Sequence, residues 1–253
     1  MGRIIVVASG KGGVGKTTVV SNLAAALSGF NKNIIAVDAN VTTSNLGLHL
    51  GIPLYPVTLQ DVLKGKARVK DALYYHPAGF RVVPADVSIK KLMVPRTDKL
   101  IDVFYRLTGE ADFVLIDSAA GLGREAKAAI EAADEMITVT NPELTALTDA
   151  LKLGKFAEDY ETRNLGIILN RVKNEKHEIK EKDVEEFLNL PIIGRVHEDR
   201  NVRKAIANKM PVVMHNPRAR SSHQFKQIAA NLIGEEYKPS FFFIDRLFGW
   251  LKY

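Results

Sequence analysis

The chain has 253 residues, of which 46% are hydrophobic and 25% are charged, a balance typical of a soluble protein with one large core. It contains no cysteine, which excludes disulfide bonds, thiolate metal sites and cysteine-held iron–sulfur clusters. Its net charge of +6 lies entirely in residues 163–253. This asymmetry favours contact with nucleic acid or lipid headgroups, unless it is simply a solvated face.

Apolar runs alternate with helical patterns along the chain. Strands are predicted at 4–7, 34–37, 80–83, 113–116, 136–139, 165–169 and 192–194. Helices are predicted at 97–107, 124–133, 143–159, 179–188 and 217–233. This alternation predicts an α/β fold with a doubly wound, mostly parallel sheet and helices on both faces. No run is long enough to span a bilayer, and a strand from residue 4 leaves no room for a signal peptide, so we expect a cytoplasmic protein.

A phosphate-binding loop follows the first predicted strand. Residues 10–17 match the pattern G-x-x-x-x-G-K-[ST], in which the backbone N–H groups turn inward around an anion. The predicted nucleotide-binding residues of this loop are Gly10, Lys11, Gly12, Gly13, Val14, Gly15, Lys16, Thr17 and Thr18. Lys16 can reach the outer phosphates of ATP, and the Thr17 hydroxyl can ligate Mg²⁺.

The residues after the loop predict a helix. Val19, Val20, Leu23, Ala24 and Leu27 recur at helical spacing, and Gly29 stands where a C-terminal cap is expected. The phosphates would therefore sit on a helix N-terminus, where the dipole and free N–H groups favour negative charge. Strand, loop and helix together predict a fold of the P-loop NTPase type.

A second lysine, Lys11, directly follows the first glycine of the loop. With it, residues 11–18 match K-G-G-x-G-K-T-T without a gap, so the chain resembles the deviant Walker A family, which includes MinD and ParA. In that family the extra lysine crosses a dimer interface and touches the partner's nucleotide. The resemblance therefore implies an ATP-dependent homodimer; the alternative for Lys11 is a solvated loop lysine.

Two predicted strands end in aspartate. Asp38 follows the strand 34–37, and Asp117 follows the strand 113–116. The carboxyl ends of parallel strands meet at one edge of the sheet, so we assign Asp38 and Asp117, with Thr17, to Mg²⁺. Residues 117–121 resemble the family's second switch. The alternative is that both acids merely end strands.

The sequence departs from the family pattern at Asn40. Residues 38–40 resemble a first switch that usually reads D-x-D, whose second aspartate orients the attacking water. Asn40 can hydrogen-bond a water but cannot accept its proton. Phosphoryl transfer depends chiefly on positioning and electrostatics, so we expect hydrolysis that is slow rather than absent.

A base-binding site is predicted at the ends of the last two strands. Asn170 and Arg171 match the family's N-R contact with adenine, and residues 196–199 resemble its V-P-E-D loop, with His197 in place of proline. Val196, His197 and Glu198 are the nucleotide-binding residues predicted in this loop. The alternative is a polar strand end followed by an acidic helix start. We also assign Asp149, in the predicted helix 143–159, to a contact with a partner.

The C-terminus forms a separate amphipathic segment. We divide the chain into an ATPase domain, 1–238, and a tail, 239–253, which resembles the C-terminal membrane-targeting helix of MinD. The side chains assigned to the membrane are Phe243, Ile244, Leu247, Phe248, Trp250 and Leu251. About ten helical residues cannot cross a bilayer, so the tail would lie in the interface. The alternative is a final helix packed on its own domain.

These features predict a MinD-like switch ATPase. ATP would dimerise it, two tails would engage an anionic membrane, and hydrolysis, with a possible protein regulator that stimulates it, would release it. The expected location is the cytoplasm, with peripheral membrane association in the ATP state. A ParA-like DNA partition ATPase, less favoured, and a regulator that positions flagella or pili are the alternatives.

Overall fold

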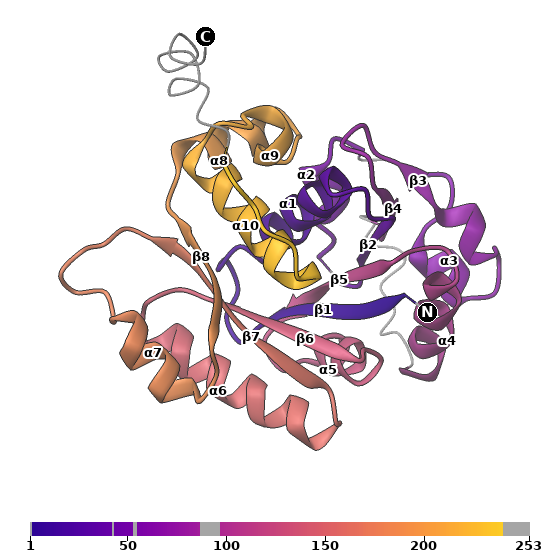
Figure 1. The fold of residues 1–253 in the computed structure, drawn as a ribbon. Coiled ribbons are helices and arrows are strands. Elements are labelled where there is room, and N and C mark those ends of the chain that lie inside the picture. Colours follow the sequence, from indigo (N-terminus) through magenta and orange to yellow (C-terminus); the bar gives the residue numbers. More distant parts are fainter. Residues whose placement is uncertain (1, 42, 53–54, 87–96, 240–253) are drawn as a thin grey trace, which may run out of the picture.

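A central sheet organises the molecule (Figure 1). The computed structural model describes residues 2–41, 43–52, 55–86 and 97–239. The strands are β1 (Arg3–Ser9), β2 (Ile34–Asp38), β3 (Tyr74–Tyr75), β4 (Arg81–Val83), β5 (Phe113–Ala120), β6 (Glu135–Thr140), β7 (Arg163–Val172) and β8 (Ile192–His197). Their order is β3-β4-β2-β5-β1-β6-β7-β8, and every neighbouring pair is parallel except β3 with β4.

Helices cover both faces of the sheet, which confirms the predicted doubly wound fold (Figure 1). One face carries the two long helices α1 (Lys16–Gly29) and α10 (Arg220–Ile233). The short helices α2 (Leu46–His49), α8 (Arg200–Ala207) and α9 (Val212–His215) lie on the same face. On the other face lie α3 (Leu59–Leu63), the 3-10 turn η1 (Val69–Ala72), α4 (Thr97–Thr108), α5 (Arg124–Glu131), α6 (Leu144–Asp159) and α7 (Glu181–Leu188). No helix of the described ranges has the length and apolar character to cross a bilayer.

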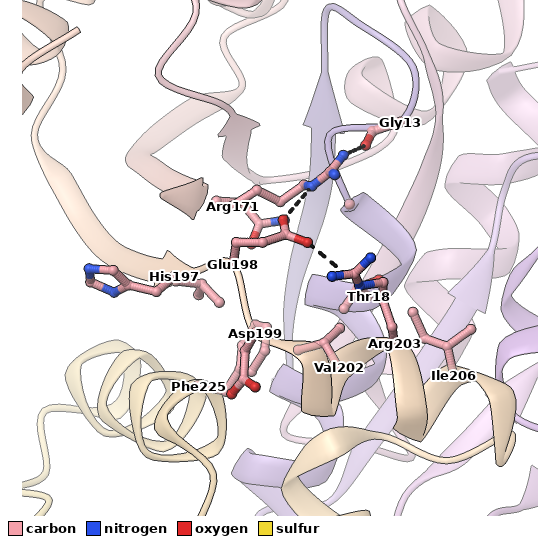
Figure 2. A pocket seen from close by; sticks show the side chains of 13 residues that line it. Gly13, Thr18, Arg171, His197, Glu198, Asp199, Val202, Arg203, Ile206 and Phe225 are labelled. Atoms are coloured by element: carbon pink, nitrogen blue, oxygen red, sulfur yellow. Dashed lines mark hydrogen bonds and ion pairs between the residues drawn. The ribbon is translucent and has the colours of Figure 1, made fainter. Parts of the chain in front are cut away.

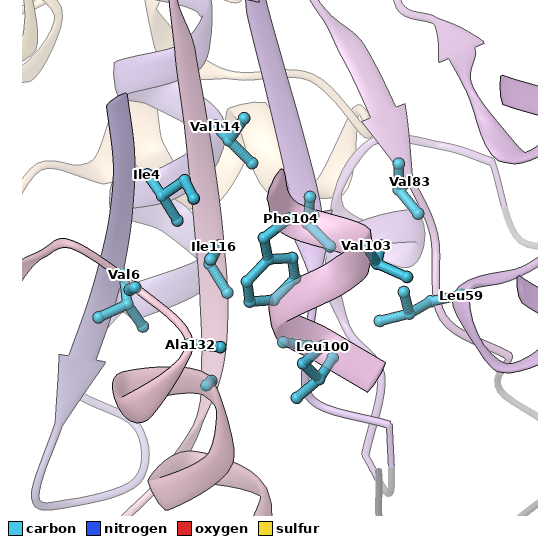
Figure 3. Close-up of a cluster of buried hydrophobic side chains, with 14 of the residues drawn as sticks. Ile4, Val6, Leu59, Val83, Leu100, Val103, Phe104, Val114, Ile116 and Ala132 are labelled. Carbon is cyan, nitrogen blue, oxygen red and sulfur yellow. The ribbon is translucent and has the colours of Figure 1, made fainter. Parts of the chain in front are cut away.

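Each face has its own apolar core. Along β1, Ile4 and Val6 belong to the core that Phe104 of α4 fills, whereas Ile5 and Val7 belong to the core beneath α1 (Figure 3). Successive side chains of a strand point to opposite faces, and both faces are covered. This is why the strands read as continuous apolar runs rather than as alternating ones.

Several predicted boundaries are wrong. The strand predicted at 113–116 continues to Ala120, because β1 pairs with it as far as Ser9, opposite Ala120. Gly29 is not a C-cap: it is the last residue of α1, Phe30 caps the helix, and Asn31 takes the left-handed conformation with φ 58°. The helix predicted at 217–233 begins at Arg220. Its first three predicted positions, including Pro217, belong instead to the turn after α9.

Candidate functional site: the phosphate loop and its pocket

The loop between β1 and α1 is closely packed at Gly10 and Gly15. Gly13 and Gly15 have φ of 81° and 100°, a conformation that side chains with a Cβ rarely adopt. A Cβ on Gly15 would lie 2.3 Å from Asn170 Nδ2, and one on Gly10 would lie 2.2 Å from the Asp149 carbonyl oxygen. The glycines of the pattern therefore meet steric demands of the surrounding strands and of α6 as well as the needs of a phosphate.

Lys16 is a buried cation at the bottom of the loop. Lys16 is the first residue of α1 and is 8% exposed, and its Nζ donates a 2.9 Å hydrogen bond to Ser9 Oγ. Burial lowers the pKa of Lys16, and the charge of Asp117 opposes that shift. An ammonium group has three donors, so further donors can serve phosphate oxygens.

Asp38 and Asp117 face each other across β2 and β5, where they are register partners, and both are fully buried. The Asp38 carboxylate accepts hydrogen bonds from Ser44 Oγ (2.6 Å) and from the backbone N–H of Leu46 (3.1 Å). Burial raises the pKa of both carboxyl groups, and the charge of Asp38 raises that of Asp117 further.

The hydrogen bonding of the Asp117 carboxylate shows whether Asp38 and Asp117 suit a metal ion. The Thr17 hydroxyl hydrogen-bonds its carboxylate, but Oδ1 is buried and has no partner among the described residues. A buried carboxylate oxygen beside a hydroxyl is a ligand set for a hard cation. The described residues hold no cluster of three or more His, Cys, Asp or Glu side chains that could bind a metal by themselves. Thr17, Asp38 and Asp117 therefore fit Mg²⁺, which characteristically keeps water and phosphate oxygens as further ligands.

Asn40 lies at the mouth of the phosphate pocket, whose lining also includes Lys16, Thr17 and Ser118. Its Nδ2 donates to the Thr43 carbonyl oxygen (2.8 Å), and its Oδ1 accepts from Thr43 Oγ1 (3.0 Å). The residue that we predict to orient water thus also closes a turn of the first switch.

The predicted base-binding residues come together around a second hollow, of about 190 Å³ (Figure 2). Its lining comprises Gly13, Gly15, Thr18, Asn170, Arg171, Val196, His197, Glu198, Asp199, Val202, Arg203, Ile206 and Phe225. Four of these, Val202, Arg203, Ile206 and Phe225, were not predicted. The helix α8, which carries three of them, has only 8 residues and is too short for a strong periodic signal.

Polar side chains around this hollow fix the loop. Asn170 Nδ2 donates to the Val14 carbonyl oxygen (2.7 Å), and Arg171 Nε donates to Glu198 Oε2 (2.8 Å). Arg171 also reaches the Gly13 carbonyl oxygen at 3.5 Å. One of the two Asn170 amide hydrogens is thereby used by the loop, and Val202 and Ile206 are among the apolar residues that line the hollow.

His197 and Asp199 connect the segment between β8 and α8 to α10. The His197 ring points away from the hollow, within 2.8 Å of an Arg220 guanidinium nitrogen (Figure 2). Asp199 caps α8 through the Asn201 N–H (2.8 Å) and accepts from Ser221 Oγ (2.8 Å). Although burial raises it, these hydrogen bonds hold the pKa of Asp199 below its usual range.

Lys11 and Asp149 lie on the rim. Lys11 Nζ is 3.3 Å from both Glu143 Oε2 and Thr145 Oγ1, and its side chain is 43% exposed. Asp149 abuts Gly10 through its backbone and pairs with Lys152 at 3.3 Å. Their predicted contacts with a partner remain predictions for a single chain. The six membrane-assigned side chains, Phe243 to Leu251, lie outside the described residues.

Comparison with known proteins agrees with this geometry. Residues 5–212 match the family model described as the CobQ/CobB/MinD/ParA nucleotide binding domain. An uncharacterized ATP-binding protein of Methanocaldococcus jannaschii is 43% identical, and the match covers 98% of this chain and 98% of that protein. The septum site-determining protein MinD of Thermotoga maritima is 32% identical over 93% of this chain and 89% of its own.

Solved structures show the same similarity. The cell division ATPase MinD of Pyrococcus furiosus superposes with a TM-score of 0.89 at 36% identity, over 92% of this chain and 99% of its own. The septum site-determining protein MinD of Pyrococcus horikoshii, complexed with Mg-ADP, gives a TM-score of 0.88 at 35% identity, over 92% and 96%.

Proposed function

Because the chain belongs to the CobQ/CobB/MinD/ParA nucleotide-binding family, we propose that it is a MinD-type switch, which dimerises around ATP and binds a membrane in that state. It is an ATPase of the MinD and ParA type, with ATP and Mg²⁺ as its ligands. The dimer, the membrane contact and the positioning of cell-division or other machinery are the parts that we propose.

The observation that carries the proposal is the contrast between the two lysines of the loop. Lys16 is buried and hydrogen-bonded at the bottom of the loop, where it serves the nucleotide of its own chain. Lys11 stands half-exposed on the rim, in an ion pair with Glu143, whose side chain is 57% exposed. Exposed ion pairs contribute only about 0–1 kcal/mol, so Lys11 can exchange this contact for another anion at little cost.

The proposed chemistry follows from the residues around the phosphates. The loop N–H groups and Lys16 would bind the phosphates, while Thr17, Asp38 and Asp117 would hold the cation. When bound, Mg²⁺ supplies positive charge against the phosphate oxygens. We assign the orientation of the attacking water to Asn40, and we expect slow turnover because an amide cannot accept the proton of that water.

Membrane binding is supported by the sequence of the tail. One short apolar segment holds a bilayer only weakly, as a single lipid chain does. Two tails on one dimer make the second insertion intramolecular, which raises avidity by about 10²–10⁴. A membrane switch therefore needs the dimer, and this coupling favours a MinD-type function over DNA partition, for which an apolar tail has no use.

Sedimentation with anionic vesicles tests this proposal. The full chain should pellet with vesicles in Mg-ATP and stay in the supernatant in ADP, and light scattering should show a dimer only in ATP. Phe248→Glu and a chain ending at Ser240 should lose the vesicles but keep the dimer, whereas the matched Phe248→Leu should keep both. Equal binding in ADP and ATP, or binding that survives truncation, would overturn the proposal.

A further inference from the structure

A long acid-free stretch builds one end of the molecule. Residues 200–233 contain no Asp or Glu, although the chain as a whole has 29. The stretch forms α8, α9 and α10. Its basic side chains are Arg200, Arg203, Lys204, Lys209, Arg218, Arg220 and Lys226. Because the segment has no acidic side chain, none of these cations can form an ion pair within it. Whether each one is paired depends on the residues that the fold places beside it.

The fold uses some of these cations internally and leaves others facing solvent. Arg203 faces Glu198 at the base pocket, and Arg220 contacts His197. Arg200, Lys204 and Arg218 are exposed, and no acidic side chain of the described ranges pairs with them. Lys226 is half-buried, and its Nζ is 3.4 Å from the Pro217 carbonyl oxygen. We call Arg200, Lys204, Arg218 and Lys226 the cationic face.

These four side chains come from adjoining segments. Arg200 and Lys204 are four residues apart on α8, on the side away from the buried Ala205. The contact of Lys226 with Pro217 brings it next to Arg218. Asp199, the cap of α8, is bonded to Ser221 in the first turn of α10, so the starts of both helices lie together.

The chain leaves the described fold beside this face. Gly234, with φ 70°, ends α10, and the backbone then turns back along that helix. Tyr237 OH lies 2.6 Å from His223 Nδ1, and the Tyr237 ring packs edge-on against Phe30. The last described residues therefore lie near the first turns of α10, at the same end as α8 and α9 (Figure 1).

We propose that the cationic face, which lies beside the end of the described chain at Pro239, is a docking surface for the headgroups of an anionic bilayer. This inference rests on the proposed function and adds a second contact to it. A single hydrophobic segment anchors weakly, and stable binding takes a second signal such as a basic patch. Eight of the fourteen residues 240–253 are Phe, Ile, Leu or Trp, a composition that a bilayer accommodates and that DNA does not.

Docking in this way leaves the nucleotide site accessible. Val202 and Ile206 of α8 line the base pocket (Figure 2). At about 100° per residue, Arg200 and Lys204 lie on the opposite side of this helix. The headgroups would thus contact one side of a short helix while nucleotide occupies the other. The same body surface can therefore act in the ATP-bound state, in which the tails also act.

The test compares two double variants of the full chain in Mg-ATP. Arg218→Gln with Lys226→Gln removes two cations of the face, and Lys155→Gln with Lys182→Gln removes two exposed cations of α6 and α7, on the other side of the sheet. Both change the net charge equally. Vesicles of phosphatidylcholine with increasing phosphatidylglycerol are the probe, with duplex DNA in a parallel titration.

Each basic side chain near an anionic membrane contributes about fivefold in affinity. We expect the first variant to bind anionic vesicles more than tenfold less tightly at 0.1 M salt, with a smaller difference at 0.5 M, and the second to stay within twofold of the parent. Equal losses in the two variants, or none, would overturn the inference. So would a loss of DNA binding with vesicle binding unchanged. ATP-dependent binding that ignored phosphatidylglycerol would refute the cationic face yet leave the tail-based switch standing.

Discussion

At the scale of single residues, the site consists of charged groups removed from water before any ligand arrives. Lys16 is 8% exposed and Asp117 is 1% exposed, and the two charges interact. Burial disfavours the charged form of both groups, and their opposite charges offset part of that cost. A bound phosphate would supply negative charge beside Lys16, and a bound cation would supply positive charge beside Asp117, so each ligand would stabilise the charged form of its neighbour.

Lys16→Ala should therefore abolish measurable ATP binding without unfolding the protein. The change removes the cation that faces the outer phosphates and also removes a buried charge, so the free energy of unfolding should change little. Calorimetric titration with Mg-ATP and urea unfolding would measure the two quantities, with the exposed Lys155→Ala as control. Undiminished ATP affinity would exclude this loop as the nucleotide site.

Asn40→Asp should raise ATP turnover severalfold or more with little change in ATP affinity, because a carboxylate can accept the proton of the attacking water. The variant loses the hydrogen bond from Nδ2 to the Thr43 carbonyl oxygen. Asn45→Asp is a matched control, since Asn45 Nδ2 donates to that same oxygen at 2.8 Å. A comparable rise in Asn45→Asp would attribute the effect to the loosened turn, and an unchanged rate in Asn40→Asp would show that position 40 does not limit the chemistry.

At the scale of elements, the sequence predicts what is long and periodic and misses what is short. The apolar run at 4–7 and the glycine loop after it place β1, the loop and α1 correctly. Burial on both faces requires a continuous apolar run, and φ above zero favours glycine, so both constraints are visible in the sequence. The extension of β5 to Ala120 depends on pairing with β1, which no local pattern records. The pocket side chains of α8 were missed because this helix has only 8 residues and because its position depends on the hydrogen bond of Asp199 to α10.

Glu135 ties three strands together where they begin. Its carboxylate pairs with Arg3 of β1 at 2.7 Å and with Arg163 of β7, and Glu135 itself is 6% exposed. Glu135→Ala should lower the free energy of unfolding by about 2 kcal/mol, because it removes charge-assisted hydrogen bonds and leaves two guanidinium groups without their acceptor. Urea denaturation measures this. The exposed Glu131→Ala should change stability by no more than about 0.5 kcal/mol, and equal effects in the two variants would contradict the role given to the ion pairs.

At the scale of the whole molecule, nucleotide binding, stability and the proposed dimerisation would form one linked equilibrium. A ligand that binds only the folded chain stabilises it by about 2.7 kcal/mol at 100 times its Kd, independently of protein concentration. A dimer adds a second, concentration-dependent contribution. In Mg-ADP the Tm should rise but stay the same at all protein concentrations, whereas in Mg-ATP it should also increase as the protein is concentrated.

Lys11→Ala separates the two contributions. The half-exposed Lys11 does not contact the buried Lys16, so its loss should leave the rise of Tm with ADP intact. If Lys11 bridges to the partner's nucleotide, the concentration dependence in ATP should vanish, and light scattering should show a monomer. Glu143→Gln is the control that removes only the ion pair with Lys11 within the chain. A Lys11→Ala chain whose Tm in ATP still rose with protein concentration would return this lysine to the role of a solvated loop residue, because the dimer would then form without it.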